Sequence, residues 1–145
     1  MLADLKELDG ASWTTPATAE QLVELEARVG RGLPRCLREY LSEFGTLAVS
    51  TLQFLGINSE CEADDLVRAI ETYVDWCMID NVLEFIPVAE FGNGDIFGVS
   101  LSDEMIYLYA HELEEWMCLD VDMCQWLKST FAEKPYLRLP KEWDR

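Results

Sequence analysis

The stretch FIPVAEFGNGDIFGVSLSDEMIYLYAH, residues 85–111, decides the fold class of this chain. It contains apolar segments rich in β-branched and aromatic residues, which favour strands. GNG and SDE separate these segments, and both are turn-forming sequences of a length that joins antiparallel neighbours. Pro87 cannot donate a backbone hydrogen bond, so we expect it at a strand edge or a bulge. The pattern predicts three consecutive antiparallel strands, at residues 83–91, 95–101 and 105–111.

Four helices are predicted around these strands, because apolar residues recur at helical spacing in four other segments. The helices cover residues 15–30, 32–45, 62–78 and 120–131. We expect Asp120 or Asp122 to cap the last of them. Residues 46–57 are rich in β-branched and apolar side chains and predict one or two short strands. Helices followed by strands, without a βαβ repeat, indicate an α+β fold.

The chain of 145 residues has the length of one ordinary domain, and it shows no internal repeat and no Gly/Ser linker. Residues 1–13 are a lead-in, either a short helix or a packed arm that ends at Trp13. The predicted domain spans residues 14–133. Residues 134–145 form a short tail punctuated by proline.

The net charge of −17 restricts the partners of this protein. Nucleic acids and anionic membranes would be repelled, because they carry negative charge themselves. A basic protein would be attracted, and its association would be fast and sensitive to salt. The composition therefore favours a positively charged protein partner.

The five cysteines indicate a reducing compartment. Their number is odd, no CxxC occurs, and they are scattered through apolar segments, which would be hazardous in an oxidising environment. The N-terminal sequence MLADLKELDG has acids beside its leucines, unlike a signal peptide, and no apolar run approaches the length of a membrane span. We therefore expect a cytoplasmic protein.

Acidic residues are concentrated in the middle of the chain. Thirteen acids and no Lys or Arg lie between Arg68 and Lys128, whereas four arginines cluster at residues 28–38. Self-repulsion on this scale costs stability, and a basic partner would relieve it. Aromatic residues lie among the acids, as in the centre of tight protein interfaces. The candidate partner-binding residues are therefore Asp75, Trp76, Asp80, Glu90, Asp95, Asp103, Glu104, Glu112, Glu114, Glu115 and Trp116.

Two simpler explanations of this stretch remain open. The acids can form a solvated face that keeps an acidic protein soluble and monomeric. The aromatic residues among them, Trp76, Tyr107, Tyr109 and Trp116, can belong to the core.

Motifs for catalysis, cofactors and metals are absent from the sequence. His111 is the only histidine, no GxSxG occurs, and GNGD lacks the lysine of a phosphate loop. No EF-hand spacing is present, and Cys118 and Cys124 match no zinc pattern, so we expect packed thiols and no cofactor. A hydrolase using two carboxylates remains an alternative, because any acidic domain offers such pairs. A non-catalytic protein is the stronger interpretation.

Residues 20–47, EQLVELEARVGRGLPRCLREYLSEFGTL, resemble the opening of the SUKH superfamily, the Smi/Knr-like domains. There, a helix with a Leu-Glu pair leads to Leu-Pro and to a second helix that bears an aromatic residue and ends in glycine. Residues 85–101 are similar to the second signature of that family, with Ile-Pro, a Gly-rich turn and Gly-Asp. MIYLYAHE and MCQWLKSTF resemble its last strand and closing helix. The matching residues are Leu25, Glu26, Leu33, Pro34, Tyr40, Leu41, Phe44, Gly45, Phe85, Ile86, Pro87, Gly92, Gly94 and Asp95.

The resemblance implies a bent, mostly antiparallel sheet with helices packed against it, and no catalysis. Bacterial members are largely immunity proteins that neutralise a cognate toxin, often a nuclease, and other members are regulatory or scaffold modules. The sequence therefore predicts an immunity protein whose acidic surface occludes a basic nuclease toxin, with Trp76 or Trp116 as an anchor. The alternative is a Smi/Knr-type interaction module. The oligomeric state remains open.

Overall fold

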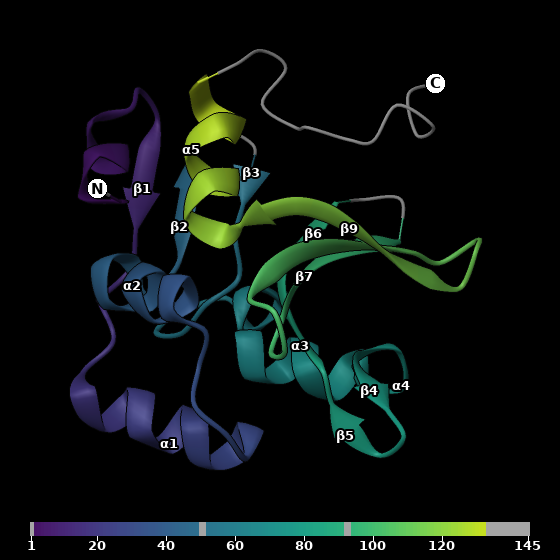
Figure 1. Cartoon of the computed structure of the whole chain (residues 1–145). Helices are drawn as coiled ribbons and strands as arrows, with labels where there is room; N and C mark the ends of the chain where they lie inside the picture. The colour runs from purple at the N-terminus through teal and green to yellow at the C-terminus, as the bar shows by residue number, and fades with distance from the viewer. Residues whose placement is uncertain (1, 50–51, 92–93, 133–145) are drawn as a thin grey trace.

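The computed structural model describes residues 2–49, 52–91 and 94–132 and confirms the α+β class (Figure 1). Its largest sheet is a run of antiparallel hairpins in the order β6-β7-β8-β9. The first three strands, β6 (Phe85–Phe91), β7 (Asp95–Ser100) and β8 (Met105–Ala110), are those predicted from the sequence. Pro87 lies in the outer strand β6, where the register shifts between Pro87 and Ala89, as its missing N–H requires.

β9 (Glu115–Asp122) is a strand that the sequence analysis missed, since the pattern predicts no strand after residue 111. Exposed and half-buried positions do not alternate regularly along it, so the strand lacks the period-two signal. The helix α5 (Met123–Ala132) consequently starts at Met123 and not at residue 120. Asp122 Oδ1 accepts from the N–H of Gln125 at 2.8 Å, which confirms Asp122 as its cap.

The first two predicted helices are confirmed as α1 (Ala19–Val29) and α2 (Arg35–Phe44). Thr18 and Gln21 form a capping box at the start of α1, because each side chain accepts a hydrogen bond from the backbone N–H of the other. α1 ends at Gly30 in the left-handed conformation, and α2 begins after Pro34.

The prediction of a single helix at residues 62–78 is wrong. The structure has a short 3-10 helix η2 (Glu62–Asp64), then α3 (Leu66–Thr72) and α4 (Val74–Cys77). Tyr73 separates the two α-helices with φ −106° and ψ 25°, and the β-branched residues on either side of it weaken helical preference. Among the described residues, no helix combines the length and apolar content needed to cross a bilayer.

Short strands complete the fold. β1 (Ala11–Trp13), β2 (Leu47–Val49) and β3 (Leu52–Gln53) form one antiparallel sheet, and β4 (Met78–Ile79) pairs with β5 (Val82–Leu83). The lead-in contributes β1 and the 3-10 helix η1 (Leu2–Glu7), which buries Leu2 and Leu5. The predicted tail at 134–145 lies outside the described residues.

The main core combines one face of the large sheet with buried residues of α1, α2, α3, α5, η1 and the three-stranded sheet. Figure 1 shows where these elements lie. The Trp126 ring of α5 lies at the centre of this core, 5.4 Å from the ring of Phe54 and 5.1 Å from that of Phe97. Met123 and Leu127 of the same helix are buried beside it. The opposite face of the sheet carries a second, smaller cluster, which forms the candidate site.

Candidate interaction surface

The second face of the large sheet is lined by aromatic residues at alternate strand positions. Phe85 lies in β6, and Tyr109 in β8 is directly opposite Trp116 in β9. Between them, Gly98 of β7 provides the space for the Trp116 ring, because a Cβ at Gly98 would lie 3.0 Å from that ring. The absence of a side chain at Gly98 therefore allows Trp116 to reach across the sheet and stack on Phe85.

Six rings follow one another across this face, and we call them the aromatic row. α4 and the residue before it supply two rings, and the sheet supplies the other four. Each ring centroid lies 4.1 to 5.1 Å from the next. The closest contact is the stack of Phe85 on Trp116, at 4.1 Å and 16°. In order, the row is Tyr73, Trp76, Tyr109, Trp116, Phe85 and Tyr107.

A carboxylate lies at each end of the aromatic row. Tyr73 donates its O–H to Glu90 at 2.8 Å, and Tyr107 donates to Asp103 at 2.6 Å. Burial and the hydrogen bond to Glu90 raise the pKa of Tyr73 to about 12. Burial opposes ionisation of Asp103, but the hydrogen bonds from Tyr107 and from backbone N–H groups outweigh it and lower the pKa of Asp103. Asp103 is therefore ionised at neutral pH.

The aromatic row is only partly covered. Phe85 and Tyr109 are buried, with 6% exposure each, whereas the other four rings are half-buried. The row thus combines packed rings, which belong to the core, with accessible ring faces and edges. Exposed apolar side chains occur nearby in sequence, on α4, on β4 and β5, and in the turn before β9; they are Val74, Ile79, Val82 and Leu113.

Nine of the eleven predicted site residues fall into two groups. The structure brings Trp76, Trp116, Glu90 and Asp103 into or beside the aromatic row. The others, at turns and element ends, are mostly exposed: Asp75 on α4, Asp80 between β4 and β5, Glu112 and Glu114 before β9, and Glu115 at its start. Burial and the charge of Glu114 raise the pKa of Tyr109.

Asp95 does not belong to the exposed acidic surface that the sequence predicts. The residue is only 6% exposed, and its Oδ1 accepts from the backbone N–H of His111 at 3.1 Å and lies 2.7 Å from His111 Nδ1. It thus joins the start of β7 to the end of β8. Glu104 lies at the other end of the sheet, where it accepts from the backbone N–H of Arg35 at 2.7 Å.

The predicted arginine cluster lies away from the aromatic row and is engaged by acids and a carbonyl. Arg28 pairs with Glu71 at 3.5 Å, Arg35 pairs with Glu39 at 3.2 Å, and Arg38 pairs with Glu26. Arg31 donates to the carbonyl of Leu101 at 2.8 Å. These contacts occupy the arginines of α1, α2 and the turn between them, and acidic side chains offset the charge of three of the four.

Comparisons with known proteins place this architecture in a family. The sequence model of the SMI1 / KNR4 family (SUKH-1) matches residues 16–133, which is most of the chain. The chain belongs to this family. The resemblance predicted from the two sequence signatures is thereby confirmed, and SUKH-1 domains are of the immunity-protein or Smi/Knr type.

A solved crystal structure of a protein from Pseudomonas syringae pv. tomato is similar to this chain. The two structures have a TM-score of 0.62 at 18% sequence identity, over 81% of this chain and 83% of the other. The match establishes a common fold. A comparison with curated proteins found no match.

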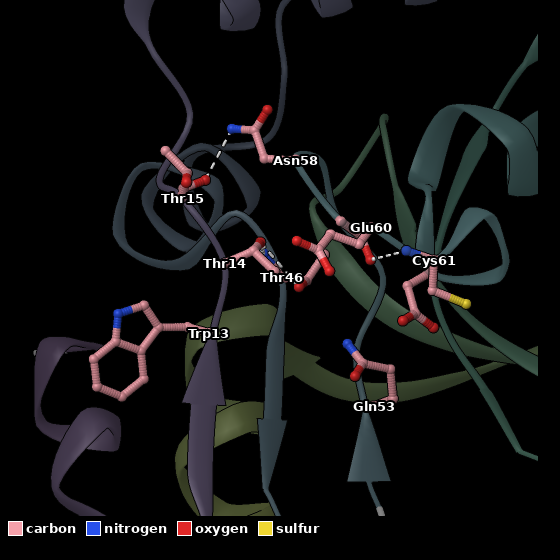
Figure 2. A pocket seen from close by; sticks show the side chains of 10 residues that line it. Trp13, Thr14, Thr15, Thr46, Gln53, Asn58, Glu60 and Cys61 are labelled. Carbon is pink, nitrogen blue, oxygen red and sulfur yellow. Dashed lines mark hydrogen bonds between the residues drawn. The ribbon is translucent and has the colours of Figure 1, made fainter.

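The SUKH-1 domain has a second surface feature, a polar cleft of about 440 Å³. It lies between the three-stranded sheet and the segment at residues 58–64, which includes η2 (Figure 2). Thr14 and Thr46 lie in its middle with their hydroxyl oxygens 3.0 Å apart, and the ring of Trp13 lies to one side. Thr14 Oγ1 also accepts from the N–H of Thr46 at 2.9 Å. These hydrogen bonds join the residue after β1 to the residue before β2. Glu60 and Asp64 add negative charge to the lining of the cleft.

One group of side chains among the described residues could hold a metal ion. The ligand atoms of Cys36, Asp122 and Cys124 lie within 4.8 Å of one another. Burial, together with Cys36 and Glu39, raises the pKa of the Cys124 thiol. The sequence analysis did not identify this group, because its members come from α2 and from the start of α5 and form no sequence motif.

Proposed function

We propose that this SUKH-1 domain is an immunity protein that binds a basic toxin and occludes it in a one-to-one complex. The observation that carries the proposal is the aromatic row with a carboxylate at each end. A guanidinium group is attracted both by the face of an aromatic ring and by a carboxylate, to which it can bind in a bidentate manner. Arginine side chains of a partner could therefore stack on the rings of the aromatic row and pair with the carboxylates at its ends.

The half-buried tryptophans are the proposed anchors. Trp76 and Trp116 are held by ring stacking and by the hydrogen bond between them, so little side-chain entropy is lost when a partner covers them. Rigid, partly exposed aromatic residues are typical centres of binding energy in protein interfaces. The surrounding acids, including Glu112, Glu114 and Glu115, would act mainly on the rate of association.

The net charge favours a nuclease as the toxin. A nuclease needs a basic groove for the phosphates of its substrate, and a domain of net charge −17 would be drawn to that groove without offering a scissile phosphate. We place this action in the cytoplasm, where the five free thiols would stay reduced.

Survival of cells that produce the toxin tests the proposal. The toxin to be tested is any basic nuclease domain found encoded beside this protein, and the two are produced together in a sensitive host. We expect the wild-type protein to restore growth and a Trp76→Ala, Trp116→Ala double variant to fail. A Glu24→Gln variant, with its change at an exposed acid of α1, is the matched control and should restore growth.

Binding measurements separate loss of the interface from loss of the fold. Both variants are checked by circular dichroism, and their affinity for a catalytically inactive toxin is measured at two salt concentrations. Neutralising Glu112, Glu114 and Glu115 together should slow association and reduce its salt dependence. An unchanged association rate would exclude these acids from the interface. Tight binding without any effect on growth would favour the Smi/Knr-type interaction module.

A further inference from the structure

Two cysteines and two acids meet where α2 lies against the start of α5. Cys36 is in the first turn of α2, and Cys124 is in the first turn of α5, which Asp122 caps. The sulfur atoms of the two cysteines and a carboxylate oxygen of Asp122 all lie within 4.8 Å of one another. A fourth donor is close by, because Cys124 Sγ lies 3.5 Å from Glu39 Oε2.

We propose that Cys36, Cys124, Asp122 and Glu39 form a binding site for a thiophilic divalent cation such as Zn²⁺. Tetrahedral zinc has Zn–S distances of about 2.3 Å and Zn–O distances of about 2.0–2.2 Å, so its ligand atoms lie roughly 3.4–3.8 Å from each other. The 3.5 Å between Cys124 Sγ and Glu39 Oε2 already fits this geometry. Cys36, Cys124 and Asp122 form the inner group, with their ligand atoms within 4.8 Å of one another, and Glu39 is the outer donor, which would have to rotate toward a bound ion.

The donor set selects the kind of metal. Two thiolates and two carboxylates suit Zn²⁺ and Cd²⁺, whereas Mg²⁺ and Ca²⁺ prefer oxygen ligands alone. All four residues are half-buried, and the side chain of Glu39 is 41% exposed, so the site is accessible to an ion from solvent. Each ligand loses its proton or carries a negative charge, and the cation would offset the repulsion among them.

The carboxylates are already oriented by contacts outside the site. Glu39 Oε1 accepts from Arg35 Nε at 3.2 Å, which turns Oε2 toward Cys124. Asp122 Oδ1 accepts from the N–H of Gln125 at 2.8 Å, and its carboxylate has a second oxygen for a metal. Such outer contacts position metal ligands in known sites. A bound ion would fasten α2 to the junction of β9 and α5.

Titration of the reduced, metal-free full chain with Co²⁺ tests the proposal. We expect intense thiolate-to-cobalt charge-transfer absorption and the visible bands of tetrahedral Co²⁺, at one ion per chain, and displacement of both by Zn²⁺. Cys36→Ser and Cys124→Ser should each abolish the charge-transfer absorption. Cys118→Ser is the matched control, because Cys118 is exposed and lies outside the group, and this variant should retain the spectrum.

Thermal unfolding gives a second readout. Zn²⁺ should raise the melting temperature of the wild type and of Cys118→Ser, but not that of Cys36→Ser or Cys124→Ser. Circular dichroism without metal establishes that the variants fold. The proposal is overturned if no charge-transfer absorption forms in the wild type, if the spectrum is octahedral, or if it persists after loss of Cys36 or Cys124.

Discussion

The indole Nε1 of Trp116 donates a hydrogen bond to the backbone carbonyl of Trp76 at 2.9 Å, and this bond joins the last strand of the sheet to α4. It fixes the two tryptophans of the aromatic row relative to each other. Because Tyr109 stacks on Trp76 and contacts Trp116, the bond and the rings form one unit.

Trp116→Phe tests the contribution of this hydrogen bond. Phenylalanine keeps an aromatic ring at the position but loses the N–H donor, so we expect a loss of about 1 kcal/mol in the free energy of unfolding. Urea unfolding measures the difference. Trp13→Phe, at an exposed ring far from the aromatic row, is the control and should change stability less. Equal stability of Trp116→Phe and wild type would contradict a structural role for the bond.

Gly98→Ala tests the space that the aromatic row requires. The new methyl group would lie 3.0 Å from the Trp116 ring and would displace it from Phe85. Forced repacking of this kind costs roughly 1–3 kcal/mol. We expect reduced stability in urea and an altered near-ultraviolet circular dichroism spectrum. If both measurements stay unchanged, Trp116 does not depend on the glycine.

Gly45→Ala and Gly30→Ala separate backbone strain from steric clash. Both glycines have positive φ, 67° and 84°, but a Cβ at Gly45 would lie 2.2 Å from the carbonyl oxygen of Thr15, whereas Gly30 has open space around it. We expect Gly30→Ala to cost about 1 kcal/mol from strain alone and Gly45→Ala roughly 2–5 kcal/mol or the fold itself. Similar costs for the two variants would exclude the clash as the cause.

Ionisation of Tyr73 should lower the stability of the folded protein at alkaline pH. The folded protein raises the pKa of Tyr73 to about 12, above the value near 10 of an unfolded tyrosine. The folded state therefore favours the protonated phenol, and this contribution is complete below about pH 10 and lost as the pH rises towards 12. The free energy of unfolding of Tyr73→Phe should fall less steeply than that of the wild type over this range. Parallel pH profiles would show that Tyr73 makes no such contribution.

The sequence predicts the elements whose apolar pattern is regular and whose ends carry capping residues. α1 and α2 show helical spacing and end at glycines, and β6, β7 and β8 are separated by turn-forming residues. These signals are local, so they can be read without the tertiary structure. The sequence does not predict β9, because neither face of this strand has a uniform environment.

The site depends on contacts that no local pattern encodes. Acidity identifies Glu90 and Asp103 as candidates. Asp103 bonds to Tyr107 within one hairpin, but Glu90 meets Tyr73 only when the residues before α4 lie against the sheet. Asp95 has the same chemistry as its neighbours and is nevertheless buried beside His111. In the same way, Cys36 and Cys124 meet only because α2 packs beside α5.

The outer position of β9 has a consequence for the behaviour of the protein at high concentration. A strand with a free edge can add a strand of another copy, and charged side chains prevent this. β9 carries Glu115, Asp120 and Asp122, and Asp120 has a positive φ of 59° that departs from extended backbone. Like charges on two such edges would repel each other at neutral pH. Acidic side chains along an outer strand therefore oppose strand addition between molecules, so replacing them with neutral residues should promote association at high concentration.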